Sequence, residues 1–136
     1  MIEINNLATN SVDGNFIKKI CRKVLKGEKK NKTELSIVFL SKDRIKKLNK
    51  EYRKKNLPTD VLSFLYNKKE GEIAICPEEV RKNARRYGTA FKKELTRVLI
   101  HGLLHLSGYD HEKSRKEAQV MEKKEKYYLE KIYVQN

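Results

Sequence analysis

The sequence predicts an α+β fold, in a single domain that covers residues 1–136. Segments with the patterns of strands and helices follow one another in the order β-α-β-α-β-β-α-α-α. No repeat, low-complexity stretch or Ser/Gly-rich linker divides the chain, and its length allows a core without disulfide staples. We therefore expect a mixed sheet of about four strands with helices packed on it.

The first two elements are a short strand and an amphipathic helix. Residues 2–4 lie in a stretch that alternates apolar and polar side chains, which is typical of a strand. Residues 12–26 carry Phe16, Ile20 and Val24 at helical spacing, so these side chains share one face. The pattern predicts a helix with one apolar side.

The next two elements are a buried strand and a basic helix. Residues 34–40 read ELSIVFL, and their length and β-branched content favour a strand. Ser41 is the expected N-cap of the helix that follows, which must end before Pro58. The side chains expected to point inward from this helix are Ile45, Leu48 and Tyr52.

The remaining elements are two strands and three helices. The strands are expected at residues 61–66 and 72–76, joined by a polar turn, and the helices at 77–87, 91–106 and 113–133. Pro77 suits the first turn of its helix and Gly88 its C-terminal cap. The helix at 91–106 is apolar on most sides, so it should be central and buried.

Composition indicates a soluble, cytoplasmic protein. The chain has two cysteines, Cys21 and Cys76, far apart in sequence and without a CxxC pair, so we expect reduced core residues rather than a disulfide framework. The N-terminus lacks the apolar run of a signal peptide, and no segment approaches the length of a membrane span.

Positive charge is concentrated in one stretch of the chain. The net charge is +14, and residues 18–55 hold 16 basic and 4 acidic side chains, whereas the rest is nearly balanced. Ion-pair networks need both signs, so a polyanion partner is the better interpretation, and nucleic acid is the commonest one. An anionic membrane is less favoured because no leucine-rich or aromatic face accompanies the charge. The lysines expected to contact a nucleic-acid backbone are Lys42, Lys46, Lys47 and Lys50.

Three histidines form the most informative pattern, H-x3-H-x2-G-x2-H. His101 and His105 are one helical turn apart and share a face. Gly108 tolerates the left-handed backbone that ends a helix, so the chain can turn back and bring His111 to the same point. Burying three unpaired imidazoles as ordinary core residues would be costly. We therefore predict one metal ion bound by these three histidines.

Zinc is the preferred metal, although imidazoles also suit copper, nickel and iron. Three protein ligands with a fourth position open to water are the arrangement of catalytic zinc. An all-histidine shell adds no negative charge, which lowers the pKa of a bound water toward about 7. Candidate partners of the imidazole N–H groups are Asp110, Glu112 and Glu94, with a plain solvated carboxylate as the alternative for each.

The same histidine frame occurs in the metzincin zinc peptidases. There the residue after the first histidine is the glutamate that acts as general base. Gly102 stands at this position, so the metal-binding frame is kept without the peptidase base.

Arg53 lies near the expected end of the basic helix. A cation is favourable there through the helix dipole alone. The functional alternative is that Arg53 holds a phosphate by bidentate contact. In that case it should face the same cleft as the three histidines.

The residues just described resemble a known family. HGLLHLSGYDH at 101–111 is similar to the signature of the YbeY endoribonucleases, and NKEYRKKNLPTDVLSF at 49–64 and EGEIAIC at 70–76 are further similarities. The resemblance implies single-strand-specific, metal-dependent cleavage of RNA in maturation of the small-subunit ribosomal RNA 3′ end and in ribosome quality control. It also implies zinc ligands at His101, His105 and His111 and a catalytic role for Arg53. Glu72 and Asn56 depart from the family's common residues.

Three functions remain open at this stage. The leading hypothesis is an endoribonuclease in which a zinc-activated water attacks a phosphodiester and Arg53 stabilises the developing charge. No side chain of the motif is an obvious general base. The alternatives are a zinc peptidase or other metallohydrolase, which the absence of a glutamate at Gly102 disfavours, and a non-catalytic ribosome-binding factor with structural zinc. Structural zinc normally has four ligands, often cysteines.

Overall fold

A computed structural model describes residues 1–8 and 12–134 and confirms the α+β class. The described part of the chain contains four strands and five helices, in the predicted order β-α-β-α-β-β-α-α-α. They are β1 (Ile2–Asn6), α1 (Gly14–Gly27), β2 (Glu34–Phe39), α2 (Lys42–Arg53), β3 (Val61–Asn67), β4 (Glu70–Ile75), α3 (Pro77–Tyr87), α4 (Phe91–Leu106) and α5 (Arg115–Val134).

The sheet is mixed, as expected, with strand order β1-β2-β4-β3. Strands β1, β2 and β4 are parallel to one another, and β3 pairs antiparallel with β4. The two antiparallel strands are longer than predicted, so the turn between them is confined to Lys68 and Lys69. Strand β3 lies at the edge of the sheet, and one side of its backbone has no neighbouring strand.

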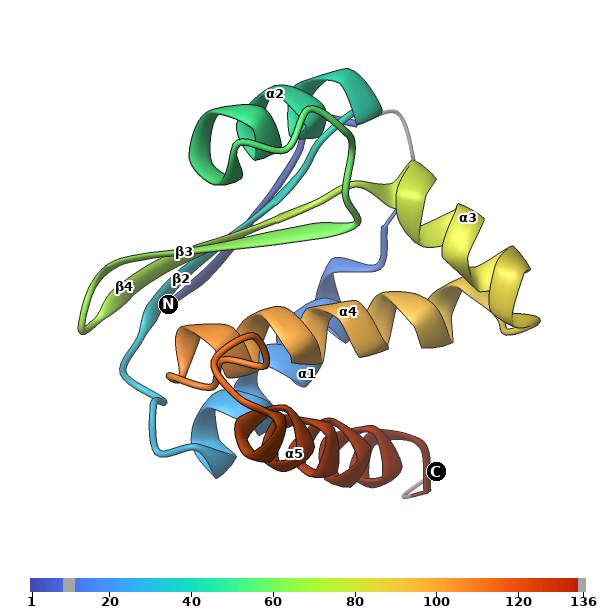
Figure 1. Ribbon diagram of the computed structural model, residues 1–136. Helices are drawn as coiled ribbons and strands as arrows, with labels where there is room; N and C mark the ends of the chain where they lie inside the picture. Colours follow the sequence, from blue (N-terminus) through green and yellow to red (C-terminus); the bar gives the residue numbers. More distant parts are fainter. Residues whose placement is uncertain (9–11, 135–136) are drawn as a thin grey trace.

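Alternating side chains place helices on both faces of the sheet (Figure 1). Leu35, Ile37 and Phe39 of β2 belong to a large core with α1, α4 and α5. Val38 of β2 points the other way and packs with Ile45 of α2 in a second, smaller core. Helix α2 therefore covers one face, and the other helices cover the opposite one.

The predicted central helix begins and ends where the pattern placed it. Helix α4 spans Phe91–Leu106, and most of its side chains are buried. It contacts α1, α3, α5 and strands β3 and β4, so it occupies the centre of its layer. A side chain that projects from α4 toward β3 is therefore attached to a well-packed, rigid helix.

One expectation about the basic stretch needs correction, and the structure also divides its positive charge between two faces of the sheet. Tyr52 was expected to point inward from α2 but is 61% exposed, because the last turn of α2 extends past the buried side chains of the smaller core. The basic residues of 18–55 are continuous in sequence but not in space, since α1 and α2 lie on opposite faces of the sheet. The sheet, with strand β2 in it, thus separates the basic residues of α1 from those of α2.

The expected helix caps and the expected burial of the two cysteines are confirmed. Ser41 caps α2, and Gly88 ends α3 with φ 63°. Cys21 and Cys76 are both buried and free. In the described ranges, no helix combines the length and the apolar character that a membrane crossing requires.

Candidate metal centre

A cleft of about 950 Å³ runs along the open edge of β3. One wall comes from the end of α2, and the other comes from α4 and the loop that follows it. The lining residues used below are Tyr52, Arg53, Phe64, His101, His105 and His111.

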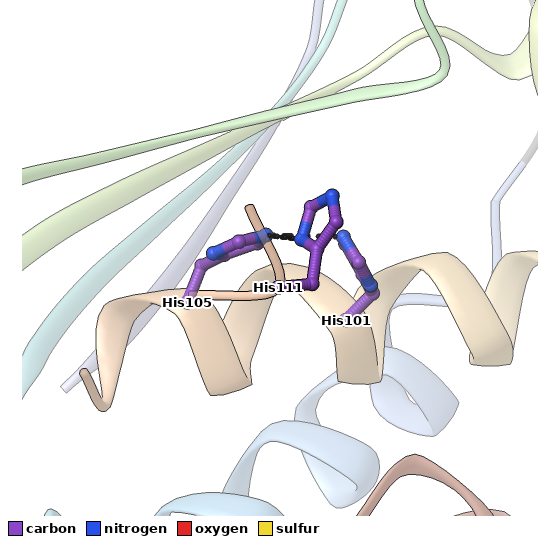
Figure 2. Close-up of side chains that lie close together, drawn as sticks. All are labelled: His101, His105 and His111. Carbon is purple, nitrogen blue, oxygen red and sulfur yellow. Dashed lines mark hydrogen bonds between the residues drawn. The ribbon is translucent and has the colours of Figure 1, made fainter. Parts of the chain in front are cut away.

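The three histidines reach this cleft from α4 and from the turn behind it. His101 and His105 are one turn apart on α4, and Gly108 follows with φ 106°. The amide of Gly108 donates to the carbonyl of His105, and the amide of Tyr109 donates to the carbonyl of Leu104. These two bonds end the helix and turn the chain back, so that His111 lies beside the two histidines of α4 (Figure 2).

The spacing of the ring nitrogens fits one metal ion. Nε2 of His105 lies 3.1 Å from Nε2 of His101 and 3.1 Å from Nδ1 of His111. One nitrogen from each ring can be chosen so that all three lie within 4.8 Å of one another. A tetrahedral Zn²⁺ with bonds near 2.0–2.1 Å separates its ligand nitrogens by roughly 3.3 Å. The donor set therefore suits such an ion with little rearrangement.

The environment of His105 favours the protonation state that a ligand needs. Burial of the ring and the neighbouring charges of His101 and His111 lower the pKa of His105. The imidazole is thus held neutral at neutral pH, and a neutral imidazole has a lone pair for a metal.

A carboxylate from α5 completes the site and was missed by sequence reasoning. The Nδ1–H of His101 donates to Oε1 of Glu125. This bond keeps the proton on Nδ1 and turns the lone pair of Nε2 toward the other two rings. Glu125 lies 24 residues from His101 on a charged helix, so nothing near the histidine motif indicates it.

The carboxylates predicted for this role have other partners. Glu94 is buried and accepts two hydrogen bonds from Arg97, at 3.0 and 2.6 Å. Asp110 accepts from the backbone amide of Glu112 at 3.0 Å. Glu112 itself pairs with Arg53 and approaches Nε2 of His111 only to 4.0 Å. Within the described residues, none of the three forms a hydrogen bond with an imidazole.

A carboxylate at the end of α1, itself held by α5, fixes the loop that carries His111. The hydroxyl of Tyr109 donates to Glu28 at 2.7 Å, and Glu28 also accepts from Tyr128 and from Lys124. Burial raises the pKa of Glu28, but these three hydrogen bonds outweigh it and leave the pKa below its ordinary value of 4.5. The end of α1 and helix α5 together hold the loop in place.

Arg53 faces the same cleft as the histidines. Its guanidinium donates to Glu112 at 3.0 Å, one residue beyond His111, and its side chain is partly exposed. The predicted lysines are placed differently. Lys42, Lys46, Lys47 and Lys50 are exposed on α2, but none of them lines the cleft, and Lys42 lies 4.0 Å from Glu79 of α3.

Gly102 is the point where α4 comes closest to the sheet. A Cβ there would lie 3.1 Å from Oγ of Ser63 and 3.2 Å from Cγ2 of Ile73. Oγ of Ser63 also donates to the carbonyl of Gly102 at 3.1 Å. The position faces the sheet, so it has no room for the glutamate that the metzincin frame carries there.

Comparison with known proteins shows which family this chain belongs to. The model of the family described as "Endoribonuclease YbeY" matches residues 3–133, a range that includes Arg53, the three histidines and Glu125. The chain belongs to the YbeY family. A YbeY protein of Thermotoga neapolitana is 48% identical over 99 residues, which are 72% of this chain and 66% of that protein. Another, from Persephonella marina, is 39% identical over 123 residues, covering 85% and 80%.

A solved structure agrees with the YbeY assignment in its overall fold. A solution structure of a Thermotoga maritima protein superposes with a TM-score of 0.73 at 36% identity, and the match covers 99% of this chain and 91% of that one. The mixed sheet and the helices around it are therefore shared beyond this chain.

Proposed function

We propose that this protein is a metal-dependent endoribonuclease and that residues 1–136 act as one metallohydrolase domain. The observation that carries the proposal is the convergence of three imidazole nitrogens, within 4.8 Å of one another, in a cleft that also contains Arg53. The curated relatives that it matches carry the name "Endoribonuclease YbeY", which supports RNA as the substrate.

His101, His105 and His111 would hold the metal, and zinc is the metal we favour. When bound, the ion would supply Lewis acidity at a phosphoryl oxygen and an activated water. Glu125 orients His101, and the hydrogen bond that Tyr109 donates to Glu28 keeps the loop of His111 in place. These contacts pre-form the donor set, so little reorganisation is needed on binding.

Arg53 is the candidate for binding the scissile phosphate. Its present partner is the exposed carboxylate of Glu112, and an exposed ion pair is worth at most about 1 kcal/mol. A phosphate can therefore displace Glu112 at small cost and accept two hydrogen bonds from the guanidinium. We assign weaker backbone contacts farther along the strand to Lys42, Lys46, Lys47 and Lys50.

The finer parts of the proposal rest on the family resemblance. They are action on single-stranded RNA, maturation of the 3′ end of small-subunit ribosomal RNA, ribosome quality control and a cytoplasmic location. Peptidase chemistry is disfavoured because Gly102 packs against the sheet and leaves no room for a base. A structural zinc site is disfavoured because the three histidines line an open cleft, and among the residues that the structure describes no fourth ligand joins their cluster.

The test combines metal analysis with RNA turnover. We expect the purified protein to bind about one equivalent of zinc and to cut single-stranded RNA, and the His105→Ala protein to lose both properties. Chelation should stop cleavage by the wild type, and added zinc should restore it. Equal cleavage by wild type and His105→Ala would overturn the proposal and indicate a contaminating nuclease.

A further inference from the structure

Exposed aromatic rings gather on the α2 side of the cleft. Tyr52 is 61% exposed and Tyr66 is 63% exposed, and both line the cleft together with Phe64. Two other tyrosines, Tyr87 and Tyr127, are also exposed but lie outside it. A single exposed tyrosine needs no explanation, whereas several apolar rings in one cleft mark a binding surface.

The rings are held in place by their neighbours. Tyr52 meets Phe64 edge to face, with ring centroids 5.1 Å apart and planes at 67°. Phe64 is partly buried against the smaller core, so it anchors Tyr52 to the sheet. Tyr66 lies at an irregularity of β3, and its hydroxyl donates at 2.8 Å to Glu72, the residue of β4 that pairs with Phe64. A ring already fixed by packing loses little freedom when a ligand stacks on it.

The charges beside these rings indicate the ligand. Arg53 directly follows Tyr52 and reaches Glu112, which is next to His111. A flat apolar surface, a guanidinium and a metal-binding cluster thus share one cleft. A nucleic acid strand has groups that match these: its bases can stack on the aromatic rings, and its phosphates can bind the guanidinium and the metal. Only unpaired bases can lay a face on an aromatic side chain, because paired bases are stacked within their duplex.

We propose that Tyr52, supported by Phe64, is a stacking platform for an unpaired nucleobase of the strand whose phosphate lies at the histidine cluster. The platform rests on the proposed endoribonuclease function and extends it. It gives preference for single strands a physical origin on this chain, since a duplex cannot supply the stacked base.

The test measures RNA binding instead of cleavage. All proteins carry His105→Ala so that the strand stays intact, and binding of a labelled oligoribonucleotide is followed by fluorescence anisotropy. Tyr52→Leu keeps an apolar side chain over Phe64 but removes the ring. Tyr87→Leu is the matched control, since Tyr87 is 62% exposed and lies on α3 outside the cleft.

Tyr52→Leu should weaken single-strand binding roughly fivefold to a hundredfold, the range for loss of one stacked base. Tyr52→Phe should retain the affinity, because it keeps the ring, and Tyr87→Leu should change it less than twofold. A duplex of the same sequence should bind all four proteins alike. For an oligonucleotide that lacks bases, Tyr52→Leu should bind as well as its parent.

Two outcomes separate the platform from the proposed function. Equal single-strand affinity of Tyr52→Leu and Tyr87→Leu, in a protein whose wild type cuts RNA, overturns the platform alone. The platform alone is also overturned if Tyr52→Leu loses the same affinity for intact strands as for strands that lack bases. Failure of the wild type to bind or cut any RNA overturns the proposed function and the platform with it.

Discussion

The carboxylate of Glu125 accepts a hydrogen bond from Nδ1 of His101, although the two residues belong to different helices. This contact makes α5 part of the candidate metal centre, in addition to its role in the larger core. It also places a carboxylate on the side of the His101 ring that faces away from the other two histidines. The site therefore includes a negative charge, although its three imidazole ligands are neutral. A carboxylate in this position raises the basicity of the histidine that it orients.

Removal of that carboxylate should weaken metal binding. We expect Glu125→Gln to lower zinc affinity about 10- to 100-fold, because His101 loses the partner that fixes its tautomer and ring orientation. Competition with a chromophoric chelator measures the affinity without any dependence on RNA. Glu122→Gln is the control, since it removes the same charge from an exposed position of α5. An equal loss in both variants would mean that overall charge, and not the contact with His101, sets the affinity.

Arg53→Ala should lower RNA turnover roughly a hundredfold, the usual cost of losing one stabiliser of transition-state charge. Zinc content and circular dichroism should stay the same, because the guanidinium contacts only an exposed carboxylate in the described structure. Arg44→Ala, at an exposed position of the same helix outside the cleft, should leave turnover unchanged. If Arg53 served only the helix dipole, its loss would appear in the free energy of unfolding and not in turnover.

Gly102→Ala should destabilise the fold by roughly 1 kcal/mol. Overpacking typically costs about 1–3 kcal/mol, and the better helix propensity of alanine returns up to about 1 kcal/mol. The added Cβ would press on Ser63 and Ile73 at 3.1 and 3.2 Å. Gly14→Ala is the control, because its Cβ would meet its nearest neighbour at an ordinary 3.8 Å. Urea unfolding of both variants measures the difference, and an unchanged Gly102→Ala protein would show that α4 shifts away from the sheet freely.

The network around Glu28 should make stability depend on acid pH. The pKa of Glu28 is lower in the folded protein than its ordinary 4.5, so its charged form stabilises the fold. This contribution is complete above pH 4.5 and is lost as the pH falls through the lower, folded pKa. Glu28→Gln should cost roughly 1–3 kcal/mol near neutral pH, as expected for hydrogen bonds to a charged group, and less in acid.

Urea unfolding of wild type and Glu28→Gln between pH 3 and pH 7 measures that difference. Glu51→Gln, at an exposed position of α2, is the control and should show no comparable change. A constant difference between wild type and Glu28→Gln across the whole range would contradict the shifted pKa.

Residues of the site that are close together in sequence could be predicted. Residues that come together only when the chain folds could not. His101, His105 and His111 lie within one helix and its terminal turn, so local geometry already places them side by side. Glu125 comes from another helix with many similar glutamates, and only the packing of α5 on α4 selects it. Tyr52 shows the limit of periodicity: its helical spacing predicts that it points inward, but the spacing does not show that the last turn of α2 extends past the smaller core.

The order in which the chain is made gives the Glu125 contact a further consequence. A ribosome synthesises α4 and its three imidazoles before it synthesises α5. A growing chain therefore has its three imidazoles for a time without the carboxylate that orients one of them or the hydroxyl of Tyr128 that helps to hold Glu28. Under the proposed function, full affinity for the metal would be reached only after α5 has docked, so an unfinished chain would bind the metal more weakly than the folded one.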